Sequence, residues 1–249
     1  MANPMEQFEI VPIAPMSAMG YDVSFTNSSL WMMIALVAVA AFLFIGTAKP
    51  QLVPNRAQAA VEYLYDFVRK MMDENVGPEG KRFVPLIFSL FIFVLACNLL
   101  GLIPWIGAFT PTSHVVVTFG LAMLVFVIVC VVGFANHGFH FFSLFWPKGV
   151  NPVLALFVAA IEFLSFLSRP FTLAIRLFAN MTAGHVLLKV FGTFVVTLGS
   201  FGALPYVFGI LPLAVNVALS ALEVLIAVVQ AYVFALLASL YLNDAINLH

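Results

Sequence analysis

One stretch of the sequence, residues 162–185, constrains the fold and the function more than any other. It is apolar over a length that would place it in lipid, yet it contains ionisable side chains. Placing an arginine at the centre of a membrane helix costs about 2.5–3.5 kcal/mol on insertion scales, so such residues are rare and usually functional. Any interpretation of the chain has to explain the polar side chains of this stretch, which are Glu162, Arg169, Arg176, Asn180 and His185.

The composition indicates a membrane protein. The chain is 63% hydrophobic and 8% charged, whereas about a quarter of the residues of a soluble domain are charged. It has no polar block from which a separate soluble domain could form, so we expect residues 1–249 to be a single all-α domain surrounded by membrane lipid. The formal net charge of −1 gives no reason to expect a nucleic-acid partner. Cys97 and Cys130 stand in apolar runs without metal or disulfide spacing, and we expect neither a cofactor nor a metal.

The apolar runs predict about five membrane helices. The first run, residues 30–47, is about 27 Å long as a helix, which is close to the hydrocarbon thickness of a bilayer. The last two runs are longer than a perpendicular span needs, so they are predicted to form a long, tilted helical hairpin with bend points at Pro170, Gly184 and Pro212. The predicted segments are an extramembrane arm at 1–29, spans at 30–48, 83–104 and 115–135, and the hairpin at 150–198 and 205–243.

The basic residues predict the orientation in the membrane. No Lys or Arg precedes Lys49, and six of the ten basic residues lie between Lys49 and Arg82. The positive-inside rule therefore places residues 49–82 in the cytoplasm and the N-terminus outside. Five spans then put Lys148 and the C-terminus on the cytoplasmic side. Apolar residues recur at helical spacing over 51–75, which predicts an interfacial amphipathic helix there.

The polar residues of the hairpin form two stripes. At about 100° per residue, Glu162 and Asn180 lie within about 40° of Arg176, while His185 lies on the opposite face of the helix. The second stripe has spacings of 4, 3 and 7 residues. Two such stripes meeting in a hairpin would line a hydrated path through the membrane. The residues of the second stripe are Asn216, Ser220, Glu223 and Gln230.

Several of these residues are also open to a structural explanation. Long basic side chains can extend toward the headgroups, hydroxyl groups can join helices, and a histidine and an acid can form a simple buried pair. Arg176 is the hardest to explain in this way, because at least six apolar or neutral residues flank it on each side. The residues with a structural alternative are Arg169, Lys189, Ser165, Ser220 and the pair of His185 and Glu223.

Two motifs carry a resemblance to a known family. RPFTLAIRLFANMTAGH at 169–185 and ALEVLIAVVQAYVFALLASLYL at 221–242 resemble subunit a of the F-type ATP synthase. The N-terminal MEQFEIVPI and SFTN resemble its alphaproteobacterial and mitochondrial branch. In that family an intramembrane arginine, matched here by Arg176, faces the ring of c subunits; its companion amide matches Asn180 and a late glutamine matches Gln230. Many bacterial members have an acid at the position of His185 and a histidine at that of Glu223, whereas mitochondrial members share the order found here.

The resemblance implies a function. It implies a proton-translocating stator subunit, not an enzyme on its own, with two offset half-channels that load and unload protons on the ring. Arg176 would separate the half-channels, His185 and Glu223 would serve the outer one, and Glu162, about 21 Å from Arg176 along an ideal helix, the cytoplasmic exit. The implied partners are the c ring, the peripheral-stalk b subunits and the remainder of the complex. The implied location is a bacterial inner membrane or, as an alternative, the mitochondrial inner membrane.

Other functions fit the sequence less well. An ion-coupled secondary transporter is the main alternative, but it predicts inverted repeats with interrupted helices at matching places, which the sequence does not show. A membrane metalloenzyme built on His137 and His140 would need further histidine pairs of this kind. A serine intramembrane protease would need a Gly-x-Ser-x-Gly-like turn, which the sequence lacks.

Overall fold

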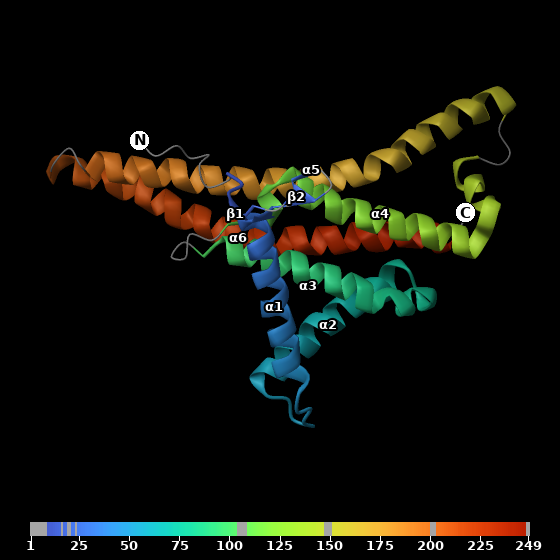
Figure 1. Cartoon of the computed structure of the whole chain (residues 1–249), viewed down its shortest axis with the longest axis horizontal. Coiled ribbons are helices and arrows are strands. Elements are labelled where there is room, and N and C mark those ends of the chain that lie inside the picture. The colour runs from blue at the N-terminus through green and yellow to red at the C-terminus, as the bar shows by residue number, and fades with distance from the viewer. Residues whose placement is uncertain are drawn as a thin grey trace. The chain divides into compact units, whose positions relative to one another are not determined.

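The computed structural model describes residues 9–15, 17–18, 21–22, 24–103, 109–146, 151–199 and 203–247. These residues are mainly helical (Figure 1). The α-helices are α1 (Asn27–Thr47), α2 (Arg56–Asn75), α3 (Val84–Gly101), α4 (Val115–His137), α5 (Pro152–Gly199) and α6 (Ala203–Ile246). Shorter 3₁₀ segments are η2 (Pro78–Phe83), η4 (Pro111–Ser113) and η5 (Gly138–Phe145).

Five helical segments of the described chain are long and apolar enough to cross a membrane. This confirms the predicted all-α polytopic fold, with the two longest segments at the C-terminal end. The segments are Asn27–Thr47, Pro78–Gly101, Val115–Phe141, Leu154–Leu198 and Ile210–Ile246. The predicted helix at 51–75 is present as α2, and it begins only at Arg56 because the side chain of Asn55 caps it, accepting a hydrogen bond from the backbone N–H of Gln58.

The N-terminal arm contains structure that its sequence did not predict. β1 (Pro12–Ala14) pairs antiparallel with β4 (Phe25–Thr26), and β2 (Ser17–Ala18) pairs antiparallel with β3 (Tyr21–Asp22). Strands of two or three residues are too short to leave an alternating pattern in the sequence. The first span also begins earlier than predicted, at Asn27, whose side-chain amide donates to the carbonyl oxygen of Glu9 and so joins the helix start to the arm.

Other boundaries differ from prediction by a few residues. α4 continues to His137, two residues past the predicted end, and Gly138 follows with a φ of 55°, which favours glycine. The backbone stays helical through Pro170, Gly184 and Pro212, so none of the three interrupts its helix. Three predicted features lie wholly or partly outside the described residues: the end of the second span at Pro104, the inside position of Lys148 and the turn at 199–205.

The chain forms two compact units. Unit 1 comprises Met1–Ala41, Ile92–His114 and Leu177–Ala231, and unit 2 comprises Phe42–Phe91, Val115–Arg176 and Tyr232–His249. The boundaries fall inside α1, α3, α5 and α6, so each of these helices contributes to both units.

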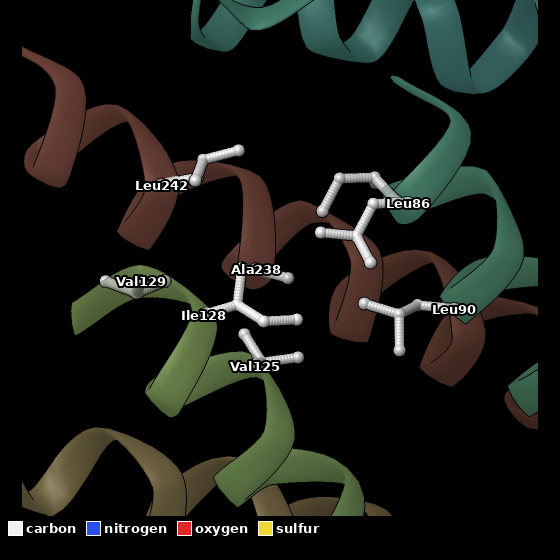
Figure 2. A pocket seen from close by; sticks show the side chains of 8 residues that line it. Leu86, Leu90, Val125, Ile128, Val129, Ala238 and Leu242 are labelled. Carbon is white, nitrogen blue, oxygen red and sulfur yellow. The ribbon is translucent and has the colours of Figure 1, made fainter. Parts of the chain in front are cut away.

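Unit 2 has an apolar core built from three helices. Branched aliphatic side chains of α3 and α4 and small or aliphatic side chains of α6 surround a narrow apolar cavity (Figure 2). The α5 segment is held by aromatic contacts, because the ring of Phe166 lies 5.1 Å from that of Phe126 and 6.1 Å from that of Phe141. The cavity is lined by Leu86, Ile87, Leu90, Val125, Ile128, Val129, Ala238 and Leu242.

Arg169 is a paired residue in unit 2. Its guanidinium donates to Asp244 Oδ2 at 2.7 Å and lies 4.8 Å from the ring centre of Tyr241. The Arg169 and Asp244 side chains are 23% and 35% exposed, so their interaction is only partly screened by solvent. The contact joins the α5 segment to the last turns of α6. Arg169 therefore has a partner inside the protein, which supports a structural role for this residue.

The end of α1 packs closely on α2 within unit 2. A Cβ atom added to Gly46 would lie 2.6 Å from Cγ2 of Val61 and 3.2 Å from the carbonyl oxygen of Ala57. The second of these is a backbone atom, which cannot move aside without displacing the helix. Gly46 therefore permits the close approach of α1 and α2.

We predict that Gly46→Ala destabilises the protein, because the added methyl group forces α1 and α2 apart. Overpacking of this kind costs about 1–3 kcal/mol. Gly120→Ala in α4 is the matched control, since nothing lies within 4 Å of a Cβ at that position. Thermal unfolding of the detergent-purified proteins measures both. Equal midpoints for Gly46→Ala and Gly120→Ala would show that the α1–α2 contact is not close in the protein.

Candidate functional site

The candidate site lies in unit 1, where Leu177–Gly199 of α5 and the segment of α6 up to Ala231 run side by side (Figure 1). Two pairs of polar side chains join the helices at this place. Asn180 of α5 contacts Gln230 of α6, and His185 of α5 contacts Glu223 of α6. The order of the two contacts is that of an antiparallel hairpin, as the sequence predicted.

The first pair is an amide–amide hydrogen bond. Nδ2 of Asn180 donates to Oε1 of Gln230 at 2.8 Å. Asn180 is exposed, whereas Gln230 is 3% exposed. Nε2 of Gln230 has no hydrogen-bond partner among the described residues. The hydrogen bond therefore holds the side-chain carbonyl oxygen of Gln230 against α5. The side-chain NH₂ group of Gln230 remains buried without a described partner.

The second pair brings an imidazole and a carboxyl group together. Nδ1 of His185 lies 3.5 Å from Oε1 of Glu223, and the two side chains are 12% and 3% exposed. The two residues therefore face each other across the hairpin. Gly184 makes room for the carboxyl group, because a Cβ at that position would lie 2.7 Å from Oε1 of Glu223. Gly184, predicted as a bend point, thus serves close packing within a continuous helix.

The two pairs show what a helical wheel of α5 alone could not, namely which direction around α5 faces α6. It placed His185 on the face of α5 opposite Arg176, away from the face that carries Asn180. Asn180 and His185 are five residues apart, so their directions differ by about 140°. Each can therefore lie about 70° to one side of the direction that faces α6. Their partners Glu223 and Gln230 are seven residues apart and share one face of α6, so both pairs form.

A hydroxyl group that the sequence analysis did not single out also contacts the imidazole. Oγ1 of Thr110 lies 2.8 Å from Nε2 of His185, and Thr110 is 4% exposed. Thr110 belongs to the segment between α3 and α4, just before η4. His185 therefore has a hydroxyl group on one ring nitrogen and a carboxyl group beside the other.

The same segment continues the polar cluster around α6. The hydroxyl group of Thr112 donates to Oδ1 of Asn98 at 2.8 Å, and Nδ2 of Asn98 donates to the carbonyl oxygen of Ala227 at 3.2 Å. Asn98 and Thr112 are both fully buried. The carbonyl oxygen of Ser113 accepts from the hydroxyl group of Thr182 at 3.4 Å. An asparagine inside an apolar span, followed by a hydroxyl-rich segment, was the signal that could have identified this cluster.

Two residues of the predicted α6 stripe, Ser220 and Asn216, form no described polar contact with α5. The hydroxyl group of Ser220 donates to the backbone carbonyl of Asn216 at 2.9 Å, within its own helix, and the side chain is exposed. Oδ1 of Asn216 is buried and has no hydrogen-bond partner among the described residues. Neither side chain therefore takes part in a polar pair with α5 such as those at Glu223 and Gln230.

Arg176 and Glu162 lie in the α5 segment of unit 2, and both side chains are exposed. No described residue of that unit forms a hydrogen bond or ion pair with either of them. Arg169, seven residues before Arg176, is by contrast paired with Asp244. Arg176 is thus a cation on the outer surface of its unit.

The described residues offer no basis for a metal centre. Groups of three or more His, Cys, Asp or Glu side chains that could hold a metal ion are absent from the described ranges. His114, which follows η4, stacks on the ring of Phe109 at 4.8 Å, and burial lowers its pKa.

Comparison with known proteins identifies the family. Residues 29–243 match the family described as ATP synthase A chain. The chain is 53% identical to the ATP synthase subunit a of Mesorhizobium japonicum, covering 98% of this chain and 96% of that one. It is 50% identical to that of Paramagnetospirillum magneticum and 48% identical to that of Rhodospirillum rubrum, each over the full length of both chains. With a match over nearly its whole length, the chain is an integral membrane protein that belongs to the ATP synthase subunit a family.

Proposed function

We propose that this chain is the proton-translocating stator subunit of an ATP synthase membrane sector and converts a proton-motive force into rotation. The observation that carries the proposal is the buried pair of His185 and Glu223, 3.5 Å apart between the two longest helices of a member of this family. A pair of this kind can relay protons. Outside a proton path it would only add the free-energy cost of keeping ionisable groups inside a membrane. The chain carries no nucleotide chemistry itself.

The partner that moves is a ring of c subunits, each with a carboxyl group in the membrane. A protonated carboxyl group can face lipid, whereas an ionised one cannot without a large free-energy cost. One half-channel on each side of the membrane lets protons reach or leave the ring. Because the two half-channels are offset, a ring carboxyl group loaded from one side must rotate before it can unload on the other.

Arg176 separates the two half-channels in this proposal. An arginine guanidinium remains cationic inside proteins, and the exposed position of Arg176 leaves it accessible to a ring carboxylate. It attracts the ionised carboxylate, favours proton release from the ring and repels a proton that would otherwise cross directly. Each elementary charge that moves through 100 mV releases about 2.3 kcal/mol, which drives the rotation.

The remaining polar residues belong to the half-channels. An imidazole and a carboxyl group can each take up and release a proton, so His185 and Glu223 serve the outer half-channel. Gln230 and its partner Asn180 lie further along the hairpin. Asn216 and Ser220 extend the same face of α6 away from Gln230. Glu162 serves the cytoplasmic exit, where its exposed carboxyl group can exchange protons with water.

The proposal includes the position of the chain in its complex. Besides the c ring, its partners are the peripheral-stalk b subunits and the remainder of the ATP synthase. The excess of basic residues between Lys49 and Arg82 supports an N-terminus outside and a C-terminus in the cytoplasm. We place the complex in a bacterial inner membrane, with the mitochondrial inner membrane as the alternative.

We predict that His185→Ala and Glu223→Ala each slow proton-driven ATP synthesis by about a hundredfold, the lower end of the range for loss of a group that transfers protons. Glu223→Gln should be equally slow, because the amide keeps the size of the side chain but cannot release a proton. The rates are measured in inverted membrane vesicles and divided by the amount of assembled complex. A simple structural pair predicts the reverse pattern, with less complex but a normal rate for each complex that remains.

We predict that α2 lies on the cytoplasmic surface of the membrane. Arg69→Cys or Lys70→Cys, made after Cys97 and Cys130 have been replaced by alanine, should react with a membrane-impermeant thiol reagent in inverted vesicles and remain unlabelled in right-side-out vesicles. Ile13→Cys in the N-terminal arm is the matched control, with an exposed side chain and the opposite expected labelling. Reaction of residue 69 or 70 from the outside would contradict the proposed orientation.

A further inference from the structure

Thr110 contacts His185 on the ring nitrogen opposite Glu223. Its Oγ1 lies 2.8 Å from Nε2, while Nδ1 of the same ring lies 3.5 Å from Oε1 of Glu223. All three side chains are buried or nearly so, with exposures of 4% for residue 110 and of 12% and 3% for the side chains of the pair. The three groups form a continuous polar row from the segment after α3, through α5, to α6.

The backbone around Thr110 holds its hydroxyl group in place. The carbonyl oxygen of Thr110 accepts from the backbone N–H of Ser113 at 3.0 Å and from its hydroxyl group at 2.6 Å. Gly101 at the end of α3 lies against the Thr110 side chain so closely that a Cβ there would overlap it. Glycine at this position thus lets the hydroxyl group reach His185, as Gly184 lets the carboxyl group of Glu223 approach from the other side.

We propose that Thr110 is a positioning residue for His185, keeping Nδ1 directed at Glu223 in both protonation states of the imidazole. The inference rests on the proposed function of the His185–Glu223 pair. A hydroxyl group suits this position because it has one donor and two acceptor lone pairs. It donates to Nε2 when the ring is neutral, and after rotation its oxygen accepts from Nε2–H when the ring is protonated. A backbone carbonyl or an ammonium group could serve only one of these states.

Charged or titratable groups other than His185 stand on each element that contacts it. Glu223 faces the ring from α6, and Lys189 stands one turn further along α5 with an exposed side chain. From the segment after α3, His114 follows Ser113, whose carbonyl oxygen accepts from Thr182 of α5. A change at Thr110 leaves all of these charges in place. A shift in pH dependence caused by that change would therefore report on the hydrogen bond itself.

The test compares Thr110→Val with Thr110→Ser in the complete ATP synthase in membrane vesicles. Proton-driven ATP synthesis is measured as a function of the pH on the side of the outer half-channel, with rates divided by the amount of assembled complex. Thr110→Val should lower the rate several-fold and move the pH midpoint down by about one unit, because the protonated ring loses the stronger, charge-assisted hydrogen bond. Thr110→Ser keeps the hydroxyl group and should keep the parental midpoint.

Two further variants make the result unambiguous. Gly101→Ala displaces the Thr110 side chain without removing its hydroxyl group, so it should reproduce the shift of the pH midpoint. If Thr110→Val fails to assemble, Gly101→Ala still tests whether the hydroxyl group positions His185. Thr193→Val is the matched control, because among the described residues the hydroxyl group of Thr193 bonds within α5, to the carbonyl oxygen of Lys189. This control should behave like the parent.

The outcomes separate this inference from the function on which it rests. A parental midpoint in both Thr110→Val and Gly101→Ala would overturn the positioning role, as would an equal loss of rate in Thr110→Val and Thr110→Ser without any shift. If His185→Ala and Glu223→Ala themselves retain the parental rate, the proposed function of the pair fails. If those two variants are slow while Thr110→Val is parental, only the role of Thr110 fails.

Discussion

A polar side chain in the hydrocarbon of a membrane has no water to bond, so it must find a partner inside the protein, reach an aqueous path or meet another subunit. This constraint orders the two long C-terminal helices. Arg169 meets Asp244, Asn180 meets Gln230, and His185 meets Glu223. Arg176 and Glu162 are exceptions, since no residue described in their unit pairs with either of them. In the proposed function, a ring carboxylate supplies the charge opposite to the arginine, which cannot itself be neutralised.

The buried pairs differ in what they can do. An amide pair such as Asn180 and Gln230 exchanges no protons, so it orders the helix interface. The imidazole group of His185 and the carboxyl group of Glu223 can exchange protons. The residues around them let the two groups approach each other closely. Gly184 admits the carboxyl group, while Thr110 supplies a hydroxyl group to the far side of the ring. The site is therefore a row of three polar groups in close approach, in which the proposed role of Thr110 is to keep the imidazole hydrogen-bonded while a proton is gained or lost.

Much of this fold could be predicted from the sequence because a bilayer demands long apolar helices, and the long runs of such residues are visible without any structure. The pairing of His185 with Glu223 could be expected from their chemistry together with the order of the two residues in the family that the sequence resembles, whereas a helical wheel of α5 alone could not show which face meets α6. Thr110 and Asn98 could not be predicted, because their contacts depend on how the segment before α4 folds against α5 and α6. The short strands of the N-terminal arm left no pattern in the sequence.

The most direct test concerns Arg176, since the proposed function gives its fixed charge the role of separating two half-channels that would otherwise form one open pore. The measurement is proton uptake after an acid pulse in vesicles stripped of the catalytic head, alongside ATP synthesis with the head attached. Arg176→Ala should abolish coupled synthesis and open a passive proton leak. Arg176→Lys should block the leak better than alanine, because it keeps a charge, yet fail to support normal rotation without the planar guanidinium. An Arg176→Ala variant that makes ATP at the parental rate would contradict the assignment, and Arg176 would then be a structural residue.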